Sequence, residues 1–209
     1  RPELIKDLRT GSGDLIVLGA GGKMGPSLAK LARTGLDAAG RTGDVVHAVS
    51  RFPDDSLRRN LTEAGVNAIP FDLVANDDLS PLPDAAGVIH MVGAKFGAGN
   101  NPSWAWEVNA ALPDRVARRY RTSRIVTLST GNVYPGSGGA TEATPPEPVG
   151  EYAQSCLGRE RVFGFAARTW GIPLSVIRLN YAIDLRYGVL ADIATRVLAG
   201  EAVPITTGH

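Results

Sequence analysis

Seven residues near the start of the chain have the composition and spacing of a phosphate-binding loop: Gly19-Ala20-Gly21-Gly22-Lys23-Met24-Gly25. The first glycine of the spaced triplet permits a tight turn, the second lets the backbone approach a pyrophosphate, and the third lets a helix pack closely on a strand. The loop separates an apolar strand predicted over 14–18 from a helix predicted over 26–33, whose N-terminal amides attract phosphate. We therefore predict dinucleotide binding by Gly19, Gly22, Lys23, Met24 and Gly25, with a merely permissive turn as the alternative.

The residues after the second predicted strand, 44–49, indicate which dinucleotide is bound. Sites that prefer NAD usually place Asp or Glu about 20 residues after the loop, where the carboxylate accepts the ribose 2′-OH. This chain has Ser50-Arg51 there, and a guanidinium pairs with a 2′-phosphate and stacks on adenine. We expect NADP(H) to be favoured over NAD(H), unless Arg51 is only a solvated loop residue. Asp72, after the third strand, is placed either to meet the adenine amino group or to cap a turn.

Short apolar runs alternate with helical patterns along the whole chain. This alternation indicates a parallel sheet with helices on both faces, in which the chain winds outward in two halves from the first strand. We predict a doubly wound, Rossmann-like α/β fold, with a dinucleotide-binding domain over 1–181 and the start of a small or truncated substrate-binding lobe over 182–209. The predicted strands are 14–18, 44–49, 66–71, 87–92, 124–129 and 174–179, and the predicted helices are 26–33, 54–64, 104–120 and 150–170.

Composition excludes several other classes of protein. The 209 residues contain 22 basic and 21 acidic side chains, so the net charge of +1 gives no reason to expect nucleic acid or an anionic membrane as partner. No apolar run reaches the length of a membrane span, no signal peptide is visible, and Cys156 is the single cysteine, so we expect a cytoplasmic protein. The three histidines lack metal-ligand spacing, and we predict no metal site.

Further motifs follow the glycine loop in a recognisable order: Phe71-Asp72-Leu73, Val88-Ile89-His90, Glu107-Val108-Asn109, Ser129-Thr130-Gly131-Asn132-Val133-Tyr134, Tyr152-Ala-Gln-Ser and Arg178-Leu-Asn-Tyr181. From about residue 14 to 190 the chain resembles the extended short-chain dehydrogenase/reductase family, specifically its NAD-dependent epimerase/dehydratase group. The resemblance implies a nicotinamide cofactor, a small-molecule substrate that is a nucleotide sugar or another polyol-like alcohol, and a homodimer.

The resemblance also implies roles for individual residues. Tyr152 corresponds to the tyrosine that moves the substrate proton and also contacts the cofactor, and Thr130 to the residue that hydrogen-bonds the reacting oxygen. Asn132 and Asn180 lie in motifs expected near the substrate. Further cofactor contacts are implied for Leu73, Met91, Val92, Gly93 and Asn109.

One position departs from the family pattern. The pattern has lysine one helical turn after the tyrosine, where it holds the ribose and lowers the tyrosine pKa, but this chain has Cys156. An unassisted tyrosine is ionised in roughly one molecule in a thousand at pH 7. We hypothesise that Lys95, after the fourth strand, supplies the missing catalytic cation or contacts the substrate, unless it is an exposed loop lysine. Arg159 is a second candidate for the cation. The function predicted is therefore an NAD(P)-dependent oxidoreductase, epimerase or dehydratase; the alternative is a catalytically impaired cofactor sensor.

Overall fold

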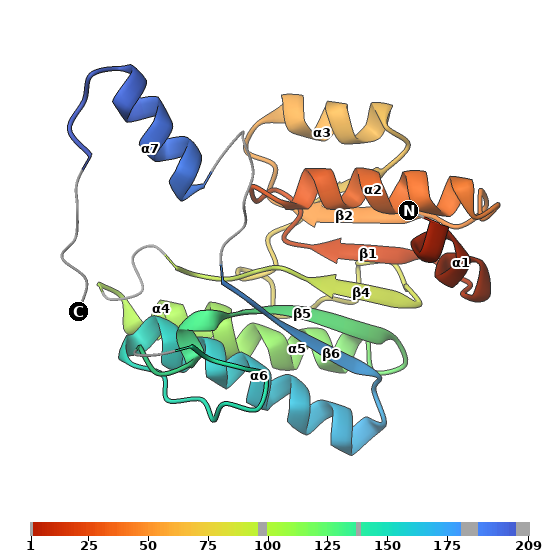
Figure 1. The fold of residues 1–209 in the computed structure, drawn as a ribbon. Helices are drawn as coiled ribbons and strands as arrows, with labels where there is room; N and C mark the ends of the chain where they lie inside the picture. The colour runs from red at the N-terminus through yellow and green to blue at the C-terminus, as the bar shows by residue number, and fades with distance from the viewer. Residues whose placement is uncertain (1, 96–99, 137–138, 181–187, 204–209) are drawn as a thin grey trace.

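The computed structural model describes residues 2–95, 100–136, 139–180 and 188–203, and at its centre six strands form one parallel sheet (Figure 1). The spatial order is β3-β2-β1-β4-β5-β6. Because β1 lies between β2 and β4, the chain winds outward from β1 first in one direction and then in the other, which confirms the predicted doubly wound α/β fold. The strands are β1 (Leu15–Leu18), β2 (Val46–Ser50), β3 (Asn67–Pro70), β4 (Gly87–His90), β5 (Arg124–Thr130) and β6 (Leu174–Leu179).

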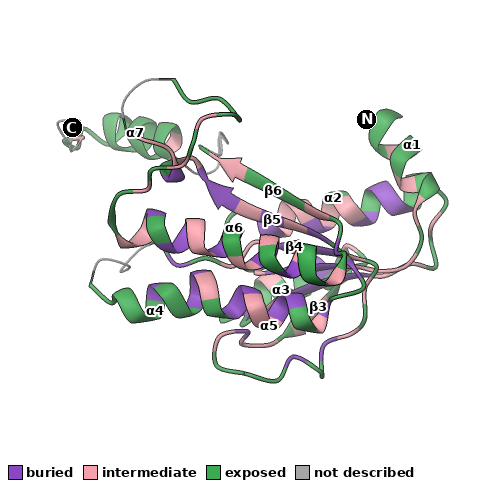
Figure 2. Cartoon of the chain, turned by 90° about the horizontal axis from the view of Figure 1, so that it is seen from below, coloured by how far each residue is buried: buried purple, intermediate pink, exposed green. Residues whose placement is uncertain are grey.

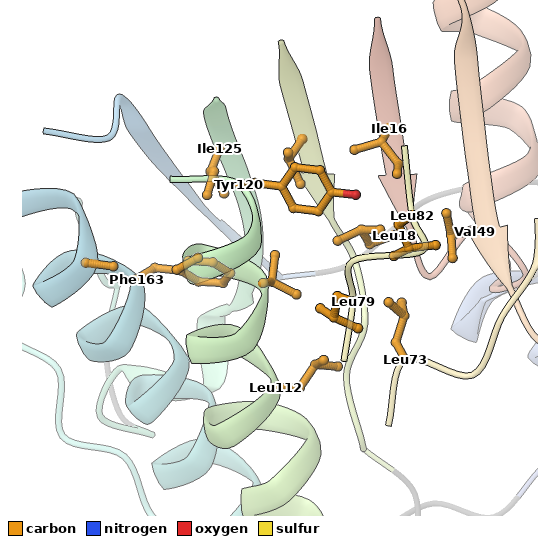
Figure 3. Close-up of a cluster of buried hydrophobic side chains, with 14 of the residues drawn as sticks. Ile16, Leu18, Val49, Leu73, Leu79, Leu82, Leu112, Tyr120, Ile125 and Phe163 are labelled. Atoms are coloured by element: carbon orange, nitrogen blue, oxygen red, sulfur yellow. The ribbon is translucent and has the colours of Figure 1, made fainter. Parts of the chain in front are cut away.

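Two apolar clusters, one on each face of the sheet, hold the helices in place. Alternate residues of β1 face the two sides of the sheet. Ile16 belongs to the cluster that also contains Tyr120 and Phe163, on the α5 and α6 side (Figure 3), whereas Val17 belongs to the cluster that contains Leu36 of α2, on the other side. The two clusters therefore hold the helices in position relative to the carboxyl ends of the strands, where this architecture binds ligands. The helices are α1 (Pro2–Thr10), α2 (Gly25–Ala38), α3 (Asp55–Glu63), α4 (Pro102–Trp106), α5 (Leu112–Arg119), α6 (Gly150–Trp170) and α7 (Val189–Leu198).

The edge strand β6 is more exposed than the interior strands. None of its residues is buried, and Val176 and Ile177 are 37% and 48% exposed. Only β5 pairs with β6, and in the described part of the chain α6 covers one of its faces. Its apolar sequence therefore predicts the strand correctly but not its burial, which depends on neighbours.

The helix predicted over 104–120 is divided into three segments. Between α4 and α5 the residues Glu107–Ala111 form a π-helical turn, in which the Leu112 amide donates to the Glu107 carbonyl. Pro113 has no N–H, so a regular ladder would leave the Asn109 carbonyl without its donor; the wider turn lies at this break. Such turns are rare and occur frequently at functional sites, and this one carries Asn109.

Helices α1 and α7 were not predicted, and neither contains a buried residue (Figure 2). The segment 76–83 contains no helix or strand, yet its Leu79 and Leu82 enter the core. Of the residues assigned to a substrate lobe, 182–187 and 204–209 lie outside the described residues, and the lobe stays a prediction. No described helix is long and apolar enough to cross a membrane.

Candidate active site

The glycine loop is held against the ends of β1 and β2. The amides of Gly19 and Ala20 both donate to the Val49 carbonyl, at 2.9 and 3.0 Å, and Gly19 has a φ of +89° that favours glycine. At Gly25 a Cβ would collide with the backbone of Ala20, so only glycine lets α2 start this close to the loop. Residue Met24 gives α2 no side-chain cap, and an uncapped helix N-terminus is suited to an anion.

A cavity of about 520 Å³ opens beside this loop at the carboxyl edge of the sheet. The structure brings nine predicted cofactor residues to its wall, while Lys23, Met24, Gly25, Asn109 and Tyr152 do not line it. The lining residues come from the glycine loop, the ends of β2, β3 and β4 with the residues that follow them, α4, and the turn after α4. They are Gly19, Gly21, Gly22, Ser50, Arg51, Pro53, Phe71, Asp72, Leu73, Val74, Ala75, Met91, Val92, Gly93, Trp104, Glu107 and Val108.

Arg51 and Asp72, the two charged residues of the cavity wall that were predicted to contact the cofactor, differ in their surroundings. Arg51 is exposed and follows β2 directly, where its guanidinium has access to a ligand in the cavity. Asp72 accepts the Val74 and Ala75 amides at 2.9 and 3.1 Å, so its carboxylate caps the turn after β3 as well as lining the cavity. Both alternatives considered for Asp72 are thus compatible with its position.

Sequence reasoning did not assign Glu107 and Val108 to the cavity. They reach the wall because the π-helical turn lies beside the end of β4. Pro113, which marks this turn, was the available signal. Gly21 was also missed as a lining residue. A Cβ at this position would collide with the Ser50 hydroxyl, so glycine here lets the loop lie close against the end of β2.

Tyr152 and Thr130 lie together at the carboxyl end of β5, where the Thr130 hydroxyl influences the pKa of the Tyr152 phenol. Thr130 is the last residue of β5, and its hydroxyl also accepts the Asn132 amide at 3.2 Å. The Asn180 side chain lies against Gly131, at a distance that would not admit a Cβ. The structure therefore brings together Thr130, Tyr152, Asn132 and Asn180, the residues that the resemblance placed near the substrate.

The surroundings of Tyr152 favour its neutral form. Burial and the neighbouring Cys156 raise the pKa of the phenol, whereas Thr130 and, as the smallest influence, the charge of Arg159 lower it. Cys156 lies one turn further along α6 and is 1% exposed, and burial likewise raises the pKa of its thiol. A neutral thiol offers Tyr152 no positive charge.

Beneath this pair, the fully buried Asn109 side chain connects three elements. Its Oδ1 accepts the Ala94 amide at 2.9 Å and Arg159 Nη2 at 2.5 Å. Its Nδ2 donates to the Ala94 carbonyl at 3.0 Å and to the Ser155 hydroxyl at 2.9 Å. All four hydrogen bonds of the amide are made within the protein. The predicted contribution of Asn109 to cofactor binding stays a prediction, and it would act through the segment at Gly93 and Ala94.

Comparison with known proteins agrees with this arrangement. The model of the NAD dependent epimerase/dehydratase family matches residues 15–207. The chain belongs to the NAD-dependent epimerase/dehydratase family. This confirms the resemblance seen in the motifs, and the match begins at the first residue of β1. A search among curated proteins found no match.

Solved structures of epimerases and dehydratases share this fold. A UDP-glucuronic acid 4-epimerase from Bacillus cereus in complex with NAD aligns with a TM-score of 0.74 and 19% identity, over 92% of this chain and 66% of its own. MoeE5 in complex with UDP-glucuronic acid and NAD gives 0.71 and 25%, over 91% and 63%. DesIV, a dTDP-glucose 4,6-dehydratase from Streptomyces venezuelae with NAD and TYD bound, gives 0.70 and 21%, over 90% and 62%. This family member thus spans less than two thirds of the length of the structures that it matches.

Proposed function

We propose that the chain forms the cofactor-binding and proton-transfer part of an NAD(P)-dependent epimerase, dehydratase or related oxidoreductase that acts on a nucleotide sugar. The observation that carries this proposal is the placement of Tyr152 beside Thr130, at the same sheet edge as the cavity beside the glycine loop. The nucleotide sugars and NAD named for MoeE5 and the 4-epimerase support the substrate class and the cofactor.

The residues at the cavity fit a dinucleotide. The uncapped start of α2 favours a pyrophosphate, and a Cβ built on Gly22 meets no heavy atom of the protein closer than 3.6 Å, which leaves its backbone open to a ligand. Gly19, Gly22 and the amides at Lys23 and Met24 would hold the phosphates, and Ser50, Arg51, Asp72 and Leu73 the adenosine half. Met91, Val92 and Gly93 would line the path toward Tyr152. A bound nicotinamide would supply the acceptance and return of a hydride.

The chain's own residues would manage the proton of the substrate hydroxyl. Tyr152 as tyrosinate takes this proton when the alcohol is oxidised to a carbonyl and, as the neutral phenol, returns it when the carbonyl is reduced. Thr130 donates to the substrate oxygen and holds it beside the phenol, and Asn132 and Asn180 contact the sugar. Lys95, which is exposed beyond the end of β4, stays one proposed source of the catalytic positive charge, and a Lys95→Gln variant tests it below.

The preference for NADP(H) rests on Arg51 at the cavity and on the lack of an acidic residue at the end of β2. A hydrogen-bonded ion pair with the 2′-phosphate is worth about 1.5–3 kcal/mol, so Arg51→Ala should weaken NADP+ binding roughly ten- to a hundredfold while NAD+ binding changes little. Calorimetric titration of both nucleotides measures this, with Arg59→Ala on the exposed side of α3 as control. Equal losses for both nucleotides would contradict the proposed preference.

Turnover is tested with a panel of UDP- and dTDP-sugars in the presence of NAD+ or NADP+. Product formation should fall at least about a hundredfold in Tyr152→Phe, since general acid–base catalysis contributes roughly that factor or more. Dinucleotide affinity should change far less. Full activity of Tyr152→Phe would remove the proposed proton-transfer role.

A second candidate function is a dinucleotide-binding protein without turnover, which reports the cofactor state to a partner. The specific observation in its favour is the neutral, buried Cys156 beside a phenol whose pKa is raised by burial. Tight dinucleotide binding without conversion of any sugar in the panel would favour this candidate.

The family resemblance further implies a homodimer, and we propose that the helices around 104–120 and 150–170, which are α4, α5 and α6, form its contact. Trp104, Trp106 and Phe165 are 39%, 39% and 54% exposed on these helices. Light scattering on the purified protein tests the dimer. The cytoplasmic location stays a prediction.

A further inference from the structure

Arg159 is a buried cation that lies below the cavity. Its side chain extends from α6, it is 5% exposed, and its two terminal nitrogens donate to neutral oxygens: Nη1 to the Leu128 carbonyl at 2.7 Å and Nη2 to Asn109 Oδ1 at 2.5 Å. Its Nε, also buried, has no hydrogen-bond partner among the described residues. A guanidinium cannot lose its proton in a protein, so this position carries a full positive charge.

The nearest acidic side chain on α6, Glu160, is engaged elsewhere. Glu160 pairs with Arg178 at 2.8 Å and accepts the Ser129 hydroxyl at 2.5 Å. Within the described ranges no carboxylate forms an ion pair with Arg159. Burying a charge without a counter-charge costs free energy, and an anion that forms near Arg159 would therefore be stabilised by the positive charge of the guanidinium.

Two features direct this positive charge toward the proposed chemistry. Tyr152, Cys156 and Arg159 are spaced by four and three residues, which places them on one face of α6. In addition, a Cβ built on Gly93 would lie 2.9 Å from Arg159 Nη2, and Gly93 lines the cavity. Only the Gly93 backbone therefore separates the guanidinium from the cavity, and glycine at this position leaves room for it.

We propose that Arg159 is a positioning residue that supplies the fixed positive charge below the cavity and favours the tyrosinate form of Tyr152. The charge of Arg159 lowers the pKa of Tyr152 against the effect of burial, and it helps to keep His90 on β4 neutral, because burial and this charge both lower the pKa of the imidazole. The other groups that face Tyr152 are the Thr130 hydroxyl and the Cys156 thiol. Lys95 is the alternative source of charge. This inference rests on the proposed function for its catalytic meaning, but its test does not.

The test is an NMR titration of isotope-labelled tyrosine in the full, ligand-free chain, with Tyr152→Phe to assign the signal. Arg159→Gln keeps hydrogen-bond donors but removes the charge, and it should raise the pKa of Tyr152 and lower the fraction of tyrosinate at a given pH. Arg159→Lys, which keeps a charge, should stay closer to the wild type. Arg168→Gln, an exposed arginine on the same helix, is the matched control and should show no shift.

The outcomes separate the possible sources of charge. An unchanged Tyr152 pKa in folded Arg159→Gln overturns the proposal, as does an equal shift in Arg168→Gln. A shift in Lys95→Gln but not in Arg159→Gln assigns the charge to Lys95 and also overturns it. Near-UV circular dichroism establishes that each variant is folded, and Arg159→Lys provides a second comparison if Arg159→Gln is not. Since no cofactor or turnover is needed, the result is independent of whether the chain proves to be an enzyme.

Discussion

Replacement of Asn109 by alanine should cost the protein a substantial part of its stability. The side chain is 0% exposed and makes four hydrogen bonds, of which three join neutral groups and one accepts from the Arg159 guanidinium. Neutral bonds contribute about 1 kcal/mol each and a charged one about 1.5–3 kcal/mol, and the alanine variant leaves their partners buried without replacement. Because such networks are not additive, we expect a loss of about 3–5 kcal/mol.

Equilibrium urea denaturation measures this loss, and the slope of the transition should stay that of the wild type. In a chain of this size the loss corresponds to a decrease in Tm of roughly 10 °C. Asn76→Ala is the matched control, because Asn76 is exposed and its amide makes one hydrogen bond, to the Asp72 carbonyl at 2.7 Å. It should cost less than about 1 kcal/mol.

Asn109→Asp distinguishes the bonds that Asn109 accepts from those that it donates. The carboxylate still accepts from Ala94 and Arg159, so this variant should be more stable than Asn109→Ala near neutral pH. The reasoning is refuted if Asn109→Ala costs no more than Asn76→Ala, since the buried network would then contribute nothing measurable to folding.

Three further predictions concern packing and pH. Gly25→Ala should destabilise the protein by about 1–3 kcal/mol and weaken dinucleotide binding, because the methyl group meets the Ala20 backbone, whereas Gly139→Ala, with open space around it, should be neutral in the same assays. The buried His90 has a pKa well below 6.5, so on acidification the unfolded chain takes up the imidazole proton before the folded chain does. The free energy of unfolding should therefore decrease as the pH falls below about 6.5. A His90→Phe variant should lack this pH dependence, and the same pH dependence in that variant would contradict the prediction. Burial raises the pKa of Tyr120 to about 12, so stability should fall by about 2–3 kcal/mol between pH 10 and 12 as the unfolded chain loses the proton, and Tyr120→Phe should lack this decrease.

The sheet was predictable because each strand carries its own signal. The apolar runs before the glycine loop and before Ser50 gave β1 and β2 to within two residues at each end, and the order of strands follows from the rule for parallel crossovers. The extra turn at Glu107–Ala111 was not predicted, because the apolar spacing through 104–120 fits one helix and the proline acts on hydrogen bonding rather than on periodicity. The helix α1 was missed although Leu4 and Leu8 are one turn apart.

The cavity wall was predictable where it depends on glycines and strand ends, and less so elsewhere. Arg159 shows the difference: its position seven residues after Tyr152 indicated the same helical face, but not that Gly93 makes room for it or that Asn109 accepts from it. These contacts join segments far apart in the chain, and no local pattern encodes them. Lys95, which comes just after the fourth strand, was the first candidate for the catalytic cation and Arg159 the second, yet in the structure Lys95 is exposed.

The pairing of β1 with β4 has a consequence for how the protein folds. Leu15 pairs with Gly87 and Leu18 with His90, so this pairing joins two strands that are separated in the chain by α2, β2, α3 and β3. Long-range parallel pairing is slow, because loop closure costs entropy before any contact rewards it. The cavity takes its walls from both sides of the β1–β4 pairing. A ligand that contacts both sides of this pairing should therefore act mainly on the unfolding rate, because it holds together two parts of the sheet that pair late in folding. Dinucleotide addition should lengthen the lifetime of the native state more than it speeds refolding.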